Sequence, residues 1–214
     1  MIEKKGWIFA WTKKSFRIQF IISLLWVCLL AFIAPKYLLF IEGRQGYEFN
    51  DIFLTYFTPV DVSWSIFTII YAGIVAALIF LIPRPLKITN TLTAYCILTT
   101  ARFASIYLIP LEPSAAIIPL NDPFAAKIVY SGEVITKDLF FSGHVSTLFL
   151  VTLAVDKGYL KVFLILATVA VALLLMIQHV HFSIDVLAAP IFAWISLKMV
   201  KLINKNKNFD SNSK

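Results

Sequence analysis

Residues that usually carry chemistry are scarce in this 214-residue chain. Only 14% of the residues are charged, and there are only two cysteines and three histidines. Both cysteines, Cys28 and Cys96, fall inside apolar runs, which favours small buried side chains over a disulfide or a metal pair. The sequence has no internal repeat and no linker, and only a short polar tail follows Lys205. A single domain therefore accounts for the chain.

Long apolar runs indicate the class of the protein. Hydrophobic residues make up 60% of the chain and the mean hydropathy is +0.84, whereas a soluble domain is usually about half apolar. The excess lies in runs close to the roughly 20 residues that a helix needs to cross a bilayer. The sequence predicts an all-α polytopic membrane protein with six transmembrane helices. The spans are expected at residues 16–34, 63–82, 89–110, 139–155, 159–178 and 182–203.

Two of these spans have special features. The third, 89–110, is unusually polar because it carries several threonines, Asn90 and Arg102. Such a span usually faces a cavity or a neighbouring helix, since lipid would leave its polar groups unsatisfied. The first span ends at Pro35 without a small-residue cleavage site, so we expect a retained helix and not a cleaved signal.

The basic residues predict the orientation in the membrane. The formal net charge is +7, but lysines and arginines lie in short blocks beside the apolar runs, so we expect no nucleic-acid partner. With six spans, most of them fall on the side of the two termini, which places both termini in the cytoplasm. We expect a basic segment at 1–15, a catalytic membrane domain at 16–203 and a polar cytoplasmic tail at 204–214. The first segment suits either an interfacial helix or a loose basic tail.

All three histidines lie in two short segments, DLFFSGH at 138–144 and HVHFSID at 179–185. With six spans, both segments fall at the extracytoplasmic ends of their helices, and Arg102 lies about two turns from the same end of the third span. Ser142 is placed to cap a helix that opens with Gly143 and His144. The start of a helix favours an anion such as phosphate, although a cap and a polar residue at headgroup level would look the same.

His181 and Asp185 are four residues apart and therefore share a helix face. A carboxylate that binds one imidazole nitrogen leaves the other as a basic nucleophile. The alternative is a polar pair that only ties helices together. Ionisable groups within a membrane usually have a function, so the catalytic interpretation is favoured.

His179 and Arg102 each have two interpretations. His179, with His181, Asp185 and His144, offers enough ligand types for zinc, although residues two apart on a helix point in different directions. Arg102 suits a bidentate clamp on a phosphate oxygen. Its alternative is a structural salt bridge to Asp185 or Asp138.

The two histidine segments resemble a known family. Residues 138–144 are similar to the "GD-Y-L-F/Y-SGH" motif of sphingomyelin synthases, and residues 179–186 are similar to their "HDHYTVDV" motif. Sphingomyelin synthases belong to the wider superfamily of lipid phosphate phosphatases (type 2 phosphatidic acid phosphatases), which is also built on six membrane helices. The resemblance covers the third to sixth spans.

The resemblance implies catalysis through a phosphohistidine, without a metal or another cofactor. His181 would attack the phosphorus of a phospholipid or lipid phosphate, Asp185 would orient His181, and His144 would protonate the leaving group. Water as acceptor would make the protein a phosphatase, and a lipid alcohol such as ceramide or diacylglycerol would make it a transferase. The residues expected to bind the substrate or its phosphate are Arg102, Asp138, Ser142, Gly143 and His179.

Two rival functions remain open at this point. One is a catalytically silent membrane protein that binds or moves lipids, which would not need the pairing of His181 with Asp185. The other is a metal-dependent membrane hydrolase that uses His144, His179, His181 and Asp185.

Overall fold

The computed structural model describes residues 2–56, 58–122 and 134–212. Helices make up 73% of it, and these residues form no strand beyond an isolated bridge between Tyr47 and Leu111. The helices are α1 (Ile2–Thr12), α2 (Lys14–Glu42), the short 3-10 helix η1 (Ile52–Tyr56), α3 (Ser63–Leu81), α4 (Pro85–Leu108), α6 (Gly143–Ala154), α7 (Tyr159–Ile177) and α8 (Ser183–Asn212). The predicted all-α class is confirmed.

Four of the described helices are long and apolar enough to cross a membrane: α2, α3, α7 and α8. They correspond to four of the six expected spans. Of the other two, α4 has 24 residues but carries many polar side chains, and α6 is an apolar helix of only 12 residues. An integral membrane protein is therefore supported by four helices.

Several helix boundaries differ from the expected ones: α4 begins at Pro85 and not at residue 89, and α8 runs to Asn212 and not to residue 203. The first span was expected to end at residue 34, but α2 runs through Pro35 as far as Glu42. Proline removes one backbone donor from a helix, and helices that cross a membrane tolerate this. The fourth span was expected from residue 139, but α6 begins at Gly143. Carbonyl groups of the preceding stretch bind side chains of α4, which keeps that stretch out of the helix.

The helices pack as a bundle in which α4 contacts α2, α6 and α8. Small and branched apolar side chains fill the main core, including Ile66, Ala94, Leu148 and Val171, each with no more than 1% of its surface exposed. Large apolar side chains such as Phe32 and Leu187 point away from the core and are mostly exposed. Such an exterior is unfavourable in water and is expected of helices that face lipid.

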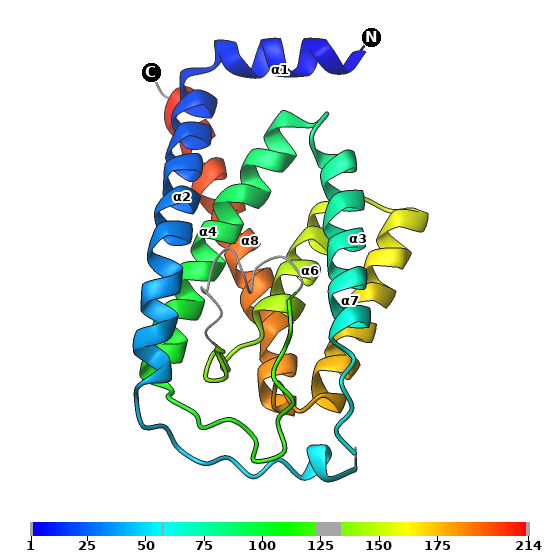
Figure 1. Ribbon diagram of the computed structural model, residues 1–214. Coiled ribbons are helices and arrows are strands. Elements are labelled where there is room, and N and C mark those ends of the chain that lie inside the picture. The colour runs from blue at the N-terminus through cyan, green and yellow to red at the C-terminus, as the bar shows by residue number, and fades with distance from the viewer. Residues whose placement is uncertain (1, 57, 123–133, 213–214) are drawn as a thin grey trace.

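The two ends of the bundle differ (Figure 1). The connections between α2 and α3 and between α7 and α8 lie at one end, at the bottom of the view. At the opposite end, α1 lies across the bundle, near the end of α8. The indole of Trp7 donates to the carbonyl of Ile82 at 2.7 Å, and the ring of Trp7 packs edge-on against Phe16 and Phe20 of α2. The N-terminal segment is thus an ordered helix and not a loose tail.

Candidate functional site

The start of α6 is capped as the sequence predicts. Ser142 is the N-cap residue, and its hydroxyl accepts a hydrogen bond from the Val145 N–H at 3.5 Å. The N–H groups of Gly143 and His144, the first two helical residues, have no acceptor within the helix. The Ser142 N–H donates to the carbonyl of Asp185 at 3.2 Å, which ties the start of α6 to α8. Among the described residues, these two donors have no hydrogen-bond acceptor, and they share one place with the positive end of the helix dipole.

The guanidinium of Arg102 lies directly against Gly143. A Cβ atom on Gly143 would be 2.7 Å from Cζ of Arg102 and 2.9 Å from Nε, closer than real Cβ contacts allow. Glycine at this position therefore lets a permanent positive charge from α4 reach the first turn of α6. The structure thus brings together Arg102, Ser142, Gly143 and His144.

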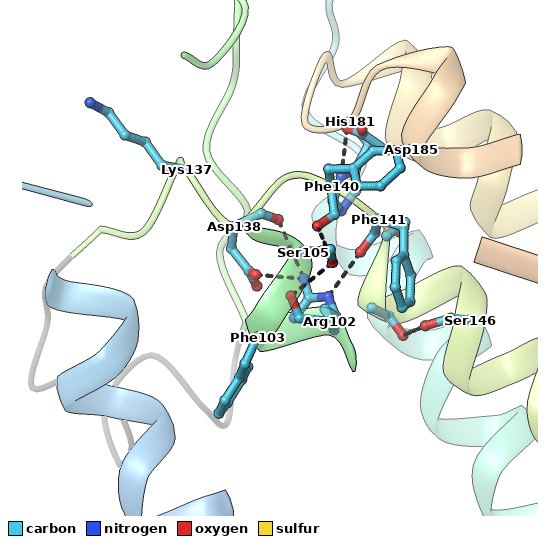
Figure 2. A network of polar contacts seen from close by, with 12 residues as sticks. Arg102, Phe103, Ser105, Lys137, Asp138, Phe140, Phe141, Ser146, His181 and Asp185 are labelled. Carbon is cyan, nitrogen blue, oxygen red and sulfur yellow. Dashed lines mark hydrogen bonds and ion pairs between the residues drawn. The ribbon is translucent and has the colours of Figure 1, made fainter. Parts of the chain in front are cut away.

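Arg102 is held by the segment that precedes α6 (Figure 2). Its Nε donates to the carbonyl of Phe141 at 2.9 Å, and its Nη2 donates to the carbonyl of Asp138 at 3.3 Å. Nη2 also forms an ion pair with Oδ1 of Asp138 at 2.6 Å. Of the two salt bridges considered from the sequence, the one to Asp138 is present. Within the described residues, Nη1 of Arg102 makes no hydrogen bond and remains a donor.

Ser105 strengthens the same arrangement from one turn further along α4. Its hydroxyl lies 3.1 Å from the carbonyl of Phe140 and 2.9 Å from the carbonyl of Arg102. Together with Arg102, it fixes the backbone of residues 138–141 to α4. Ser105 was not among the residues predicted for the site, although its spacing of three residues from Arg102 places both on one helix face.

His181 and Asp185 form the predicted pair. Nδ1 of His181 lies 3.4 Å from Oδ2 of Asp185, and the side chains are 2% and 0% exposed. The same carboxylate oxygen accepts the N–H of Phe182 at 3.0 Å, so Asp185 also caps the start of α8. Because Asp185 lies at Nδ1, the other nitrogen of His181, Nε2, is left for chemistry.

His144 lies beside this pair. The ring centroids of His144 and His181 are 6.5 Å apart and their planes are inclined by 63°. Phe67 of α3 contacts the His144 ring edge-on at 5.8 Å. Among the described residues, Nδ1 of His144 and Oδ1 of Asp185 are buried without a hydrogen-bond partner. Buried polar atoms of this kind are costly, and their presence is typical of a functional site.

His179 is part of a helix C-terminus. Its backbone is left-handed, with a φ of 58°. The His179 N–H donates to the carbonyl of Met176, and the Val180 N–H donates to the carbonyl of Leu175. This is a Schellman motif with histidine where glycine is usual. The His179 ring is directed to Ser114, whose Oγ lies 3.5 Å from Nδ1. Within the described residues, His144, His179, His181 and Asp185 are not grouped as metal ligands would be.

Two residues that the sequence analysis did not single out support the site. Gln178, fully buried, donates from Nε2 to the Ser63 hydroxyl at 2.9 Å and to Ile118 O at 3.1 Å, and its Oε1 accepts the Val62 N–H at 3.0 Å. Asp51 accepts the Ser183 N–H, which holds a loop against the start of α8. A polar residue at the end of an apolar run was the only signal for Gln178 in the sequence.

An acidic and a basic side chain lock two loops together beside the site. Glu112 accepts the N–H of Gly46 at 2.6 Å and the ammonium of Lys137 at 2.9 Å. The Gly46 N–H, followed by the Lys137 ammonium, lowers the pKa of Glu112 below its usual value. Lys137 directly precedes Asp138, so this contact anchors the segment that holds Arg102.

No protein-family model matches the chain, and no curated protein matches it either. The function must therefore be argued from the geometry of the site.

Proposed function

We propose that the protein is an integral membrane enzyme that transfers or hydrolyses a phosphate-bearing lipid headgroup through a phosphohistidine intermediate. One observation carries the proposal: the rings of His144 and His181 lie 6.5 Å apart, and Asp185 lies at Nδ1 of His181. Nucleophilic catalysis needs an activated nucleophile, a group that orients it and an acid for the leaving group. His181, Asp185 and His144 match these three roles.

The first step forms a bond between Nε2 of His181 and the phosphorus of the lipid. As that bond forms, the bond from phosphorus to the leaving alkoxide breaks, and protonated His144 gives its proton to the alkoxide oxygen. Asp185 orients the His181 ring and stabilises the positive charge that it gains. In the second step His144 takes a proton from the acceptor, whose oxygen displaces Nε2 of His181 and restores the enzyme.

The phosphoryl oxygens are bound by the start of α6 and by Arg102. The N–H groups of Gly143 and His144 and the Nη1 group of Arg102 supply donors at a positive helix end. The ion pair with Asp138 holds the guanidinium in place. His179, whose ring is directed to Ser114, supports the α7–α8 turn that carries His181.

The proposal places six helices across the membrane. Besides the four apolar helices, α4 crosses with its polar face against α2 and α8, and α6 crosses together with the buried stretch before it, where Leu139 and Phe141 are at most 2% exposed. Twelve residues of α-helix span only about 18 Å, so α6 alone is too short. Both termini lie in the cytoplasm and the histidines lie near the extracytoplasmic face.

The test uses purified full-length protein in lipid micelles with labelled phosphatidylcholine, phosphatidylethanolamine and phosphatidic acid, with and without ceramide, diacylglycerol and EDTA. Label that moves to a lipid alcohol identifies a transferase, and release of phosphate or of the phosphorylated headgroup identifies a hydrolase. Inhibition by EDTA would favour a metal-dependent hydrolase. No turnover with any of these lipids would favour a protein that only binds or moves lipids.

A further inference from the structure

A cavity lies at the opposite end of the bundle from the histidines, beside α1. It has a volume of about 850 Å³ and is lined by side chains of α1, α2 and α4 and by Asn204 of α8. Its roof is fixed because Trp7 binds the carbonyl of Ile82 and Trp11 packs against Phe16 and Phe20. The cavity is therefore built by packed elements and is separate from the site of the proposed reaction.

The cavity is positively charged. Lys13, Arg84 and Lys87 line it, and none of the side chains that the structure describes around it is acidic. Lys87 is paired with Asp156 outside the cavity, but both side chains are more than a third exposed, so the pair is weak and readily exchanged. The ammonium of Lys13 lies over the ring of Phe9, 5.2 Å from its centroid. Arg84 donates to the carbonyl of Phe80 and lies over its ring, 3.8 Å from the centroid. An anion entering here therefore meets Lys13 directly and the charges of Arg84 and Lys87 nearby.

The floor of the cavity offers hydrogen-bond donors. Asn90 accepts hydrogen bonds from Gln19 at 3.1 Å and from Asn204 at 2.8 Å, both through its amide oxygen, and its NH₂ group has no acceptor among the described residues. The start of α4 also opens into the cavity at Pro85 and Leu86. Its N-cap residue, Arg84, provides no side-chain cap. The free N–H groups of that first turn favour negative charge.

Thr89 points to a ligand independently of the charges and of the start of α4. It lines the cavity and is 1% exposed, yet its hydroxyl has no partner among the described residues. Other threonines of these helices donate to the carbonyl four residues earlier, as Thr91, Thr93 and Thr100 do. A buried hydroxyl that forgoes this bond costs free energy unless something else satisfies it.

We propose that this cavity binds the phosphate group of an anionic membrane lipid. The cations and hydrogen-bond donors of the cavity suit a phosphate group, and two features favour a lipid as its source. Phe9 of α1 lines the cavity and is 66% exposed, and its neighbour Ile8 is 69% exposed, so acyl chains have apolar surface to lie on beside the cavity. Lys13 lies between α1 and α2, and Arg84 and Lys87 lie at the start of α4. All three are therefore at the end of the bundle that α1 crosses (Figure 1), where helices that cross a bilayer meet the headgroups.

The experiment measures equilibrium binding of labelled dioleoylphosphatidylglycerol to full-length protein in neutral detergent. Dioleoylphosphatidylcholine is the zwitterionic control, and glycerol 1-phosphate and inorganic phosphate are the soluble competitors. The variants are Lys13→Gln, which removes a charge at the rim, and Thr89→Val, which keeps the side-chain shape without the hydroxyl. Lys36→Gln is the matched control, because Lys36 of α2 is, like Lys13, an exposed lysine whose ammonium lies over a ring, in this case that of Phe32.

We expect saturable binding of phosphatidylglycerol, tighter than that of phosphatidylcholine and weakened about fivefold in Lys13→Gln and in Thr89→Val. Lys36→Gln should bind as the wild type does. Unchanged affinity in either cavity variant overturns the site. Displacement of the lipid by glycerol 1-phosphate or inorganic phosphate at the same concentration overturns the lipid as the source of the phosphate.

Discussion

Arg102 and Gly143 are matched to each other, since the guanidinium of the first occupies the space where a side chain of the second would begin. The closest approach would be 2.7 Å, between a Cβ on Gly143 and Cζ of Arg102. The contact joins α4 to the residue that precedes His144. It thereby couples the charge that we propose to bind phosphate to the position of the proposed acid.

Replacing Gly143 by alanine should displace Arg102 and lower activity. We expect kcat/KM to fall about tenfold to a hundredfold, because the displaced guanidinium no longer lies where we propose that it binds the substrate. Each increase of about 1.4 kcal/mol in the barrier reduces the rate tenfold. The free energy of unfolding should fall by about 1–3 kcal/mol, which is the usual cost of overpacking. Gly43→Ala is the control, because its Cβ would meet only backbone oxygens at 3.7 Å or more. Equal activity of Gly143→Ala and Gly43→Ala would contradict the proposed role of this contact.

Asp185→Asn should keep the fold and lose most of the activity. Its amide oxygen still accepts the Phe182 N–H, but the negative charge beside His181 disappears. We expect kcat to fall by about 10² or more with little change in KM, since the charge acts in the transition state. The measurement is steady-state kinetics, together with a thermal melt to show that the variant is folded. A rise in KM with kcat unchanged would instead assign Asp185 to substrate binding.

Gln178→Leu should destabilise the protein. The substitution leaves the Val62 N–H, the Ser63 hydroxyl and the Ile118 carbonyl without the partner that Gln178 provides. We expect a cost of about 2–4 kcal/mol, because each buried polar group left unpaired costs roughly 1–3 kcal/mol. Thermal unfolding in detergent measures the effect, and Gln45→Leu, at an exposed loop position, is the control. A melting temperature equal to that of the control variant would refute this account of the α7–α8 turn.

The contact of Glu112 with Gly46 and Lys137 should make stability depend on pH. The pKa of Glu112 is lowered in the folded protein, so its contribution is complete above the unfolded pKa of about 4.5 and is lost as pH falls through the folded pKa. Thermal melts between about pH 6 and pH 3 should fall less steeply in Glu112→Gln than in the wild type. Glu48→Gln, an exposed acid in the loop that contains Gly46, should follow the wild-type curve. Parallel curves for all three proteins would contradict the role of Glu112.

Much of the site could be predicted from local sequence. The Ser142 cap and the pairing of His181 with Asp185 depend on residues three or four apart, and helix geometry alone brings these together. The apolar runs likewise marked the four helices that are long and apolar enough to cross a membrane. Such features need no knowledge of which helices are neighbours.

Other features depend on contacts between distant segments, which the sequence does not specify. The contact of Arg102 with Gly143 arises because α4 packs against α6. The role of Gln178 arises because the loops that contain Val62 and Ile118 meet at the C-terminal end of α7. The left-handed backbone of His179 could not be foreseen, because histidine is uncommon at that position of a helix end. The helix also continued beyond Pro35, where the sequence suggested that it stops.

The central claim is that Nε2 of His181 carries the phosphoryl group between two steps of the reaction. It is tested most directly by mixing the enzyme with lipid labelled at phosphorus, quenching in alkali and locating the label by peptide mass spectrometry. We predict label on the peptide that contains His181, no label in His181→Gln, and no turnover by that variant although it folds. Label on another residue, or turnover by His181→Gln at the wild-type rate, would contradict the mechanism.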